Sequence, residues 1–201
     1  MVNPHPLDTG LYHRHSLSLV TAPAVDIRAL GLEHIPAFRA LRLDALRQHP
    51  EAFVPTWEEE RAVDPATVAS RYRNEWISDG NFILGAFVHG RLVGAVGVRR
   101  WTRQKQRHRA SIWLLYTDAS VRGLGIGRSL LEAAIDGCRR MPGIEMVHLS
   151  VSAESTSARR LYEATGFRCY GVEPKAIRLE DRSIDVALMA LDLAGDTAAS
   201  A

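Results

Sequence analysis

Several segments of the chain alternate between apolar and polar residues or form short apolar runs, patterns that are typical of β-strands packed against a core. Two neighbouring segments are joined by His89-Gly90-Arg91, a short connection that predicts a β-hairpin. The segments for which we predict strands are residues 25–30, 82–88, 92–98, 111–117, 146–151, 167–172 and 183–193.

Other segments repeat apolar residues every three or four positions, which predicts amphipathic helices. Asp64 followed by Pro65 is typical of a helix start, Pro50 of a helix end, and Gly166 of a C-terminal cap. Residues 56–61 either form a short helix capped by the initial threonine or stay irregular. The longer predicted helices cover residues 33–49, 64–76, 125–140 and 155–165.

The order of these elements is strand, two helices, three strands, helix, strand, helix and two strands. This order predicts one mixed α/β domain over residues 24–193, with no repeat and no internal linker. Residues 1–23 contain prolines and histidines without a clear period, so we expect a poorly ordered N-terminal arm. Residues 194–201 are mostly small and predict a flexible tail.

Composition narrows the class of protein without naming a partner. The chain has 201 residues, of which 46% are hydrophobic and 24% charged, as in an ordinary globular domain. The formal net charge of +2 gives no general argument for nucleic acid or an anionic membrane as partner. No apolar run reaches about 18 residues, so we expect no transmembrane helix and no membrane partner.

Two features of the sequence concern its compartment. Residues 17–25 are apolar-rich and contain Ala-Pro-Ala, which mimics a signal-peptide cleavage site. Ser and Thr interrupt this short stretch, and we do not expect secretion. Cys138 and Cys169 are too few for a disulfide framework or a cysteine-based zinc site. We therefore expect free, buried thiols in a cytoplasmic protein that carries no metal.

The strongest chemical signal is a turn that contains Gly123, Gly125 and Gly127 between a predicted strand and an amphipathic helix. Glycines let the backbone adopt positive φ and approach a ligand closely. The N-terminus of the following helix has unpaired N–H groups and a partial positive charge. Arg122 and Arg128 add possible charge-assisted hydrogen bonds. Together these features predict a site for a phosphate group.

Three kinds of phosphate ligand are candidates for this turn, and the alternative is a tight turn that binds no ligand. A nucleotide P-loop requires a lysine before Ser or Thr, whereas this chain has Arg128-Ser129. A dinucleotide fold requires GxGxxG in an early βαβ unit, whereas the third glycine here comes one residue early and past the middle of the chain. The third candidate is the pyrophosphate of coenzyme A, which a family resemblance favours.

Residues 111–131 resemble the GNAT acetyltransferases, whose pattern is a strand, a short loop and [QR]-x-x-G-x-[GA]. This chain has Arg122-Gly123-Leu124-Gly125-Ile126-Gly127 at that point. About thirty residues later, Leu161-Tyr162-Glu163-Ala164-Thr165-Gly166-Phe167 matches the second family pattern, L-Y-x-x-x-G-F. With the preceding hairpin, the resemblance covers roughly residues 80–193.

The resemblance implies a GNAT-like α/β fold, with a mixed, mostly antiparallel sheet of about seven strands and helices on both faces. It implies acetyl-CoA as co-substrate and transfer of its acetyl group to a primary amine by direct attack in a ternary complex. Tyr162 matches the family tyrosine that protonates the departing thiolate. A phenol with a pKa near ~10 is suited to that role, although the residue also fits an apolar helix face as a plain core residue.

The resemblance also indicates which residues contact the coenzyme. Ser155 stands where the family often has asparagine; it can cap the helix and bind the coenzyme, but it reaches less far. Thr117 and Ala119 replace a frequent valine and proline, in positions that act mainly through the backbone. The expected coenzyme-binding residues are Leu115, Tyr116, Thr117, Arg122, Gly123, Gly125, Ile126, Gly127, Arg128 and Ser155.

The general base and the acceptor stay open at this level. The acidic triplet at residues 58–60 is our choice for the acceptor side, where it attracts a cationic amine. The acceptor is either a small molecule or a protein. The candidates for the base, besides a water chain, are Glu58, Glu59, Glu60, His108, Glu173 and Asp185.

Two other functions remain as alternatives. The first is a non-catalytic regulatory module that binds acetyl-CoA without turnover. The second is nucleic-acid binding by the basic stretch at residues 99–109, which we do not expect because no nucleic-acid-binding signature accompanies it. A homodimer is common in the family, and no residue in this sequence decides the oligomeric state.

Overall fold

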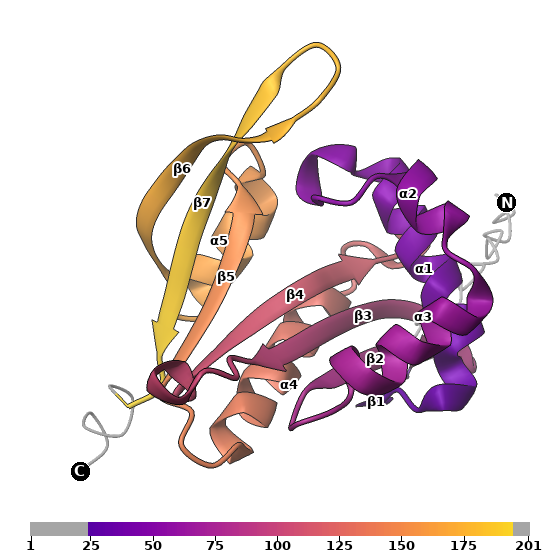
Figure 1. Cartoon of the computed structure of the whole chain (residues 1–201), viewed down its shortest axis with the longest axis horizontal. Coiled ribbons are helices and arrows are strands. Elements are labelled where there is room, and N and C mark those ends of the chain that lie inside the picture. Colours follow the sequence, from indigo (N-terminus) through magenta and orange to yellow (C-terminus); the bar gives the residue numbers. More distant parts are fainter. Residues whose placement is uncertain (1–23, 195–201) are drawn as a thin grey trace, which may run out of the picture.

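The computed structural model describes residues 24–194 and contains one seven-stranded sheet in the order β1-β2-β3-β4-β5-β7-β6 (Figure 1). All neighbouring strands are antiparallel except β4 and β5. The expected arm at residues 1–23 and the tail at 195–201 lie outside the described residues. The strands are β1 (Val25–Ala29), β2 (Phe82–Val88), β3 (Arg91–Arg100), β4 (Arg109–Thr117), β5 (Met146–Ser152), β6 (Arg168–Arg178) and β7 (Ser183–Asp192).

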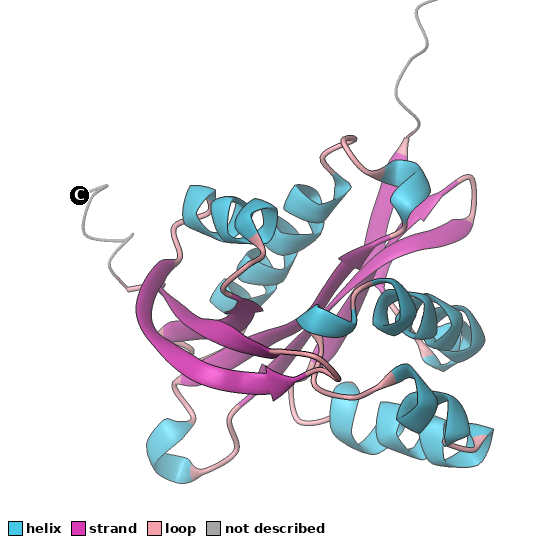
Figure 2. Ribbon diagram, turned by 90° about the horizontal axis from the view of Figure 1, so that it is seen from above, coloured by secondary structure: helices cyan, strands magenta, loops and turns pink. Residues whose placement is uncertain are grey.

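Helices cover both faces of this sheet (Figure 2). This arrangement confirms the predicted fold class. The helices are α1 (Ile35–Gln48), α2 (Trp57–Ala62), α3 (Pro65–Arg71), α4 (Ile126–Arg140) and α5 (Thr156–Ala164). None of the helices in residues 24–194 is long and apolar enough to cross a bilayer.

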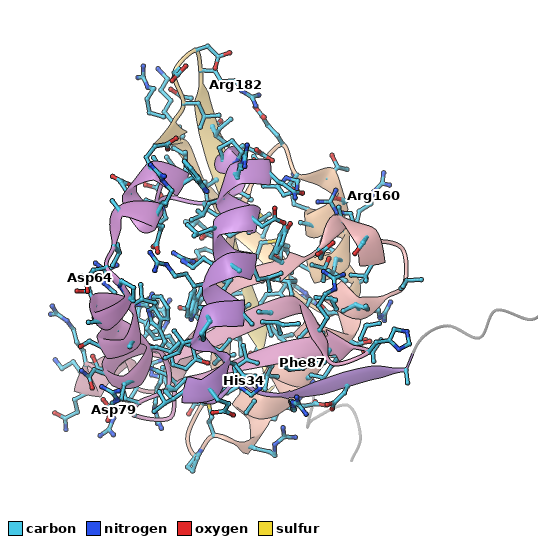
Figure 3. All side chains as sticks on the ribbon, turned by 90° about the vertical axis from the view of Figure 1, so that its right-hand side faces the viewer. His34, Asp64, Asp79, Phe87, Arg160 and Arg182 are labelled. Carbon is cyan, nitrogen blue, oxygen red and sulfur yellow. The ribbon has the colours of Figure 1, made fainter. Side chains whose placement is uncertain are left out.

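The helix boundaries follow from their caps. Asp64 accepts a 3.0 Å hydrogen bond from the Thr67 N–H and starts α3, as predicted (Figure 3). Thr56 and Glu59 exchange side-chain-to-backbone hydrogen bonds of 2.8 and 3.1 Å, so the uncertain segment after residue 56 is a capped helix, α2. α3 ends earlier than predicted because the chain continues as a π-helical turn, Tyr72–Trp76.

Two hydrophobic cores fix the helices to the sheet. The first lies between the sheet, α4 and α5, and contains fully buried Leu130, Leu131 and Met189. The second lies under α1 and contains Phe38 and Tyr72, whose rings meet edge to face at 5.6 Å. The sheet is therefore buried on both faces along β2, β3 and β4.

A bulge interrupts β4 near its middle. Its register with β3 shifts between Ala95 and Gly97, and Leu114 has a φ of 51°. The extra residue turns both Trp113 and Leu114 toward the second core. Gly97 allows this because any side chain there would collide with the Trp113 ring. β4 therefore changes direction at Leu114.

β4 and β5 pair only at their first residues and then diverge (Figure 1). The pairing runs from Arg109 opposite Met146 to Ser111 opposite His148. Beyond that point β4 stays bonded to β3 and β5 to β7, so the facing edges of β4 and β5 have no ladder between them. Backbone N–H and C=O groups on these edges are available to a ligand that enters the divergence.

The structure also corrects an expected strand boundary and the expected burial of a cysteine. β6 continues to Arg178 rather than ending near residue 172, and it includes Pro174. A proline is tolerated there because β6 is an edge strand and its register with β7 shifts between Glu173 and Ile177. Cys138 is buried as expected, but Cys169 is exposed because it lies on this edge strand; both are free thiols.

Candidate functional site

The glycine-rich turn connects the end of β4 to the start of α4. Gly123 and Gly125 have φ angles of 80° and 75°, and a Cβ atom added to either one would meet no atom within 4 Å. The Gly125 carbonyl accepts a 3.0 Å hydrogen bond from the Ser129 N–H, so the helical ladder starts there. The turn thus combines positive-φ backbone with open space, and it presents the first N–H groups of α4 to that space.

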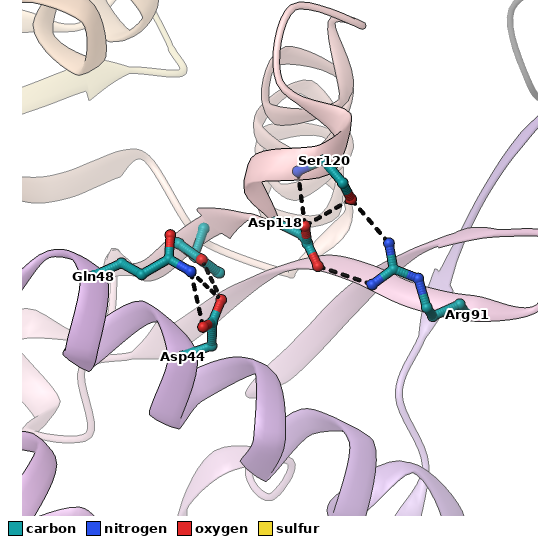
Figure 4. A network of polar contacts seen from close by, with 6 residues as sticks. Asp44, Gln48, Arg91, Asp118 and Ser120 are labelled. Carbon is teal, nitrogen blue, oxygen red and sulfur yellow. Dashed lines mark hydrogen bonds and ion pairs between the residues drawn. The ribbon is translucent and has the colours of Figure 1, made fainter.

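The residues just before the turn form a polar network that the sequence analysis did not identify (Figure 4). Asp118 accepts hydrogen bonds of 2.8 Å from the Ser120 N–H and 2.7 Å from its hydroxyl, and one of 2.8 Å from Arg91. The hydrogen bonds from Ser120, followed by that from Arg91, lower the pKa of Asp118 to about 2. An aspartate two residues before a serine is a local signal for such a turn.

Three elements meet at the first turn of α4. Gly127 lies under the methyl group of Thr117 on β4 and the side chain of Leu161 on α5, which a Cβ would approach to 3.8 and 4.0 Å. The Ile126 side chain is buried in the first core and fixes the direction of the helix. The structure therefore brings the two sequence motifs together at the N-terminus of α4.

The two arginines of the turn already have protein partners. Arg128 donates a 2.8 Å hydrogen bond to Glu132, an exposed pair one helical turn away. Such a pair contributes only about 0.3–0.5 kcal/mol and yields readily to a stronger anion. A terminal nitrogen of Arg122 instead lies 2.7 Å from Nε2 of His49, the residue that follows α1. His49 lies 73 positions away, and nothing in the sequence signals this contact.

The C-terminal part of β4 offers its backbone rather than its side chains. The Tyr116 side chain points away from the first core and donates a 2.7 Å hydrogen bond to Asp44 on α1. Gln48 donates two further hydrogen bonds to Asp44, at 2.8 and 2.9 Å (Figure 4). Burial, followed by the hydrogen bond to Asp44, raises the pKa of Tyr116. Leu115 packs against the opposite core.

Tyr162 is nearly buried on α5, with 8% of its surface exposed. Its ring meets Phe167 edge to face at 6.0 Å. Burial raises the pKa of Tyr162 to about 12, so the phenol keeps its proton at neutral pH. Among residues 24–194, no group forms a hydrogen bond with its hydroxyl. The structure thus holds a rigid, protonated phenol with a free donor.

Ser155 is the N-cap residue of α5, but its side chain makes no capping hydrogen bond. This corrects the expectation that the serine caps the helix, because its backbone angles (φ −79°, ψ 78°) differ from the extended angles seen at the capping residues Thr56 and Asp64.

The acidic triplet has three different environments. The Glu59 carboxylate accepts a hydrogen bond from the Thr56 N–H in the cap of α2, and Glu58 is exposed. Glu60 is the least exposed member: only 12% of its side chain is exposed, and it accepts a 2.8 Å hydrogen bond from Arg42. The Arg42 guanidinium lies 5.8 Å from the centre of the Trp113 ring, at the β4 bulge. Glu60 is therefore linked to the strand that diverges from β5.

The other candidate bases lie on different elements. His108 precedes β4, and its carbonyl accepts hydrogen bonds from Glu145 and Met146 at the paired end of β4 and β5. Asp185 accepts a 2.7 Å hydrogen bond from the Lys175 N–H and stabilises the irregular part of the β6–β7 hairpin. Glu173 is exposed on β6. The described part of the chain contains no group of three His, Cys, Asp or Glu side chains suited to a metal ion.

Part of the basic stretch at residues 99–109 serves the fold. Arg100 donates hydrogen bonds to the carbonyls of Arg107 and Pro142, at 3.0 and 2.9 Å. Arg109 lies 3.9 Å above the Trp101 ring and donates a 2.9 Å hydrogen bond to His148. Burial, then the charge of Arg109, lowers the pKa of His148. These contacts occupy guanidinium N–H groups of Arg100 and Arg109 and leave their charges in place.

Comparison with known proteins gives a consistent result. The model of the acetyltransferase (GNAT) family matches residues 41–167. Mycothiol acetyltransferase of Sanguibacter keddieii is 31% identical over 163 residues, which cover 80% of this chain and 49% of that protein. Mycothiol acetyltransferase of Beutenbergia cavernae is 31% identical over 131 residues, or 65% of this chain and 40% of that protein. The chain thus spans about half the length of these curated relatives.

Solved structures share the fold. A GNAT-family acetyltransferase from Streptococcus pneumoniae superposes with a TM-score of 0.75 and 22% identity, over 85% of this chain and 100% of that chain. A protein from Salmonella typhimurium, determined with its cofactor acetyl-CoA, superposes with a TM-score of 0.73 and 22% identity, over 85% of this chain and 94% of that chain.

Proposed function

The chain belongs to the acetyltransferase (GNAT) family, and we propose that it transfers an acetyl group from acetyl-CoA to a primary amine by direct attack in a ternary complex. One observation carries this proposal. The open turn at Gly123 and Gly125 leads into the N-terminus of α4, beside the divergence of β4 and β5. An anionic group fits the turn, and an extended chain fits the unpaired strand edge.

The proposed coenzyme contacts come from the glycine turn, the end of β4 and Ser155. The N–H groups of the turn and of Ile126, Gly127 and Arg128 face the pyrophosphate, and the guanidinium groups of Arg122 and Arg128 add charge. The backbone of residues 115–117 hydrogen bonds the pantetheine arm, and the Ser155 hydroxyl gives one further contact. The fit is supported by the space at Gly123 and Gly125, which no protein side chain fills.

Acetyl transfer forms a bond between the acceptor nitrogen and the carbonyl carbon and breaks the bond between that carbon and sulfur. The nitrogen releases one proton, which passes to solvent through a water chain, and solvent returns a proton to the phenolate of Tyr162 after the thiol has left. Backbone N–H groups at the free edge of β4 stabilise the negative charge that develops on the carbonyl oxygen. Tyr162 donates its proton to the departing sulfur. The free donor of its hydroxyl supports this role, and burial keeps the phenol protonated until the sulfur departs.

The acceptor side is proposed to lie along α2 and the β4 bulge. Glu60 supports this because it is the acidic residue of the triplet that is linked, through Arg42, to Trp113. Because Arg42 compensates the charge of Glu60, the exposed carboxylate of Glu58 is the member of the triplet that favours a cationic amine at the entrance. Since curated relatives are named mycothiol acetyltransferases, mycothiol-type amines belong in the set of acceptors to be tested, together with polyamines, amino acids and peptide N-termini.

The test is a thiol-release assay with acetyl-CoA and this set of amines. We expect release of CoA that depends on one class of amine, with the acetyl group on the amine by mass spectrometry. Tight coenzyme binding without turnover on any amine would instead support a non-catalytic acetyl-CoA-binding module. Absence of both binding and turnover would contradict the proposal.

A further inference from the structure

Arg122, in the proposed coenzyme turn, is held by a residue from a distant part of the chain. Its terminal nitrogen lies 2.7 Å from Nε2 of His49, which follows the last residue of α1. Within residues 24–194, the Arg122 side chain makes no other hydrogen bond. A guanidinium has five N–H donors, so most of them remain available.

The chemistry of the pair fixes the state of the imidazole. Arginine only donates hydrogen bonds, so Nε2 of His49 must be the acceptor. A neutral ring then carries its proton on Nδ1, which lies 3.2 Å from the Glu51 carboxylate. The three side chains form an ordered series in which Glu51 orients His49 and His49 holds Arg122.

The segment that carries His49 is itself fixed in place. The Tyr116 ring lies 6.2 Å from the His49 ring, and the Tyr116 hydroxyl bonds Asp44 one turn earlier on α1. The next residues form the turn Pro50–Ala52, which packs against β5. The segment therefore reaches from the end of β4 to β5 at the side where these strands diverge.

We propose that His49 is a positioning residue for the coenzyme: it holds the Arg122 guanidinium at the rim of the glycine turn, with its remaining N–H groups free for the pyrophosphate. This inference rests on the proposed function. An exposed arginine otherwise samples many rotamers, and binding would have to order it. A side chain that is already oriented loses less entropy when the anion arrives, so the coenzyme binds more tightly.

The test is a double-mutant cycle measured by calorimetric titration with CoA. We expect His49→Ala to weaken CoA binding about fivefold to tenfold, as for the cost of ordering one rotamer-rich side chain on binding. On the Arg122→Ala background, the same change should have no further effect because its partner is absent. His49→Gln should stay within about twofold of wild type, because the amide oxygen replaces Nε2 as acceptor.

The glutamine variant and thermal unfolding of each protein distinguish a change in the fold from a loss of positioning. A loss of positioning leaves the unfolding temperature unchanged and is rescued by glutamine. Equal or tighter CoA binding in His49→Ala would overturn the inference, the latter because His49 would then compete with the phosphate for Arg122. So would an equal loss from His49→Ala with and without Arg122. Failure of the wild-type protein to bind CoA would overturn the proposed function, and the positioning role with it.

Discussion

The Tyr116 hydroxyl donates a 2.7 Å hydrogen bond to the Asp44 carboxylate across 72 positions of sequence. This contact joins the end of β4 to α1. It fixes the helix beside the divergence of β4 and β5, and it turns the Tyr116 side chain away from the proposed coenzyme path. The backbone of β4 can therefore bind the coenzyme, while the Tyr116 side chain holds α1 against the sheet.

Removal of this contact should lower stability. We expect Tyr116→Phe to reduce the free energy of unfolding by about 1–2 kcal/mol, because Asp44 loses a buried donor. Urea unfolding measures the change. Tyr170→Phe is the matched control, since that side chain is 59% exposed on β6. Equal stabilities for both variants and the wild type would show that the hydrogen bond contributes nothing.

Tyr162→Phe should remove the proton donor while keeping the buried ring. We expect kcat to fall by about 10²-fold or more, with little change in the KM for acetyl-CoA, as for loss of a general acid. Because burial raises the pKa of Tyr162 to about 12, the phenol should stay protonated at pH 7–10. A pH–rate profile of the wild type should therefore show no alkaline loss from this group below about pH 11. A kcat within twofold of wild type would exclude Tyr162 as the acid.

Asp118 should stabilise the turn in a pH-dependent way. Its pKa is lowered from 3.8 to about 2, so its contribution is complete above about pH 4 and is lost as the pH falls through about 2. We expect Asp118→Ala to cost about 1 kcal/mol at pH 7, as for loss of a cap. Thermal unfolding should show this difference shrinking between pH 4 and pH 2. A difference of the same size at both ends would contradict the assignment.

Gly125→Ala should weaken coenzyme binding beyond its effect on the fold. The substitution forces a side chain into a φ of 75° and into the open space of the turn. We expect about tenfold weaker CoA binding and a stability loss of about 1 kcal/mol. Gly143→Ala is the control, because Gly143 has a φ of 73° and lies past the other end of α4. Equal effects of both variants on CoA binding would contradict a ligand role for the turn.

The features that the sequence predicted are those that local interactions determine. The glycine turn, the start of α4 and the helix cap at Gly166, whose φ is 95°, depend on neighbouring residues and were predicted at the right positions. The start of α3 at Asp64 follows the same rule, whereas the sequence left residues 56–61 open between a capped helix and irregular chain. The family and the fold class were confirmed because two local motifs with correct spacing determine them together.

The features that the sequence did not predict depend on distant partners or on backbone geometry. His49 and Asp44 reach the end of β4 only after α1 packs on the sheet. The bulge at Leu114 results from the register with β3, and the length of β6 from its pairing with β7. Ser155 has the residue type of a cap but not the backbone angles. These relationships are set by tertiary packing.

The most direct measurement of the central claim is a pair of calorimetric titrations of the wild-type protein. One uses acetyl-CoA, and the other uses S-acetylpantetheine, which carries the same thioester but lacks the pyrophosphate and the nucleotide. The glycine turn predicts clear binding of acetyl-CoA and at least about tenfold weaker binding of the truncated thioester, because the anion contacts at α4 are missing. Equal affinities, or no binding of acetyl-CoA, would contradict the assignment of the turn as a pyrophosphate site.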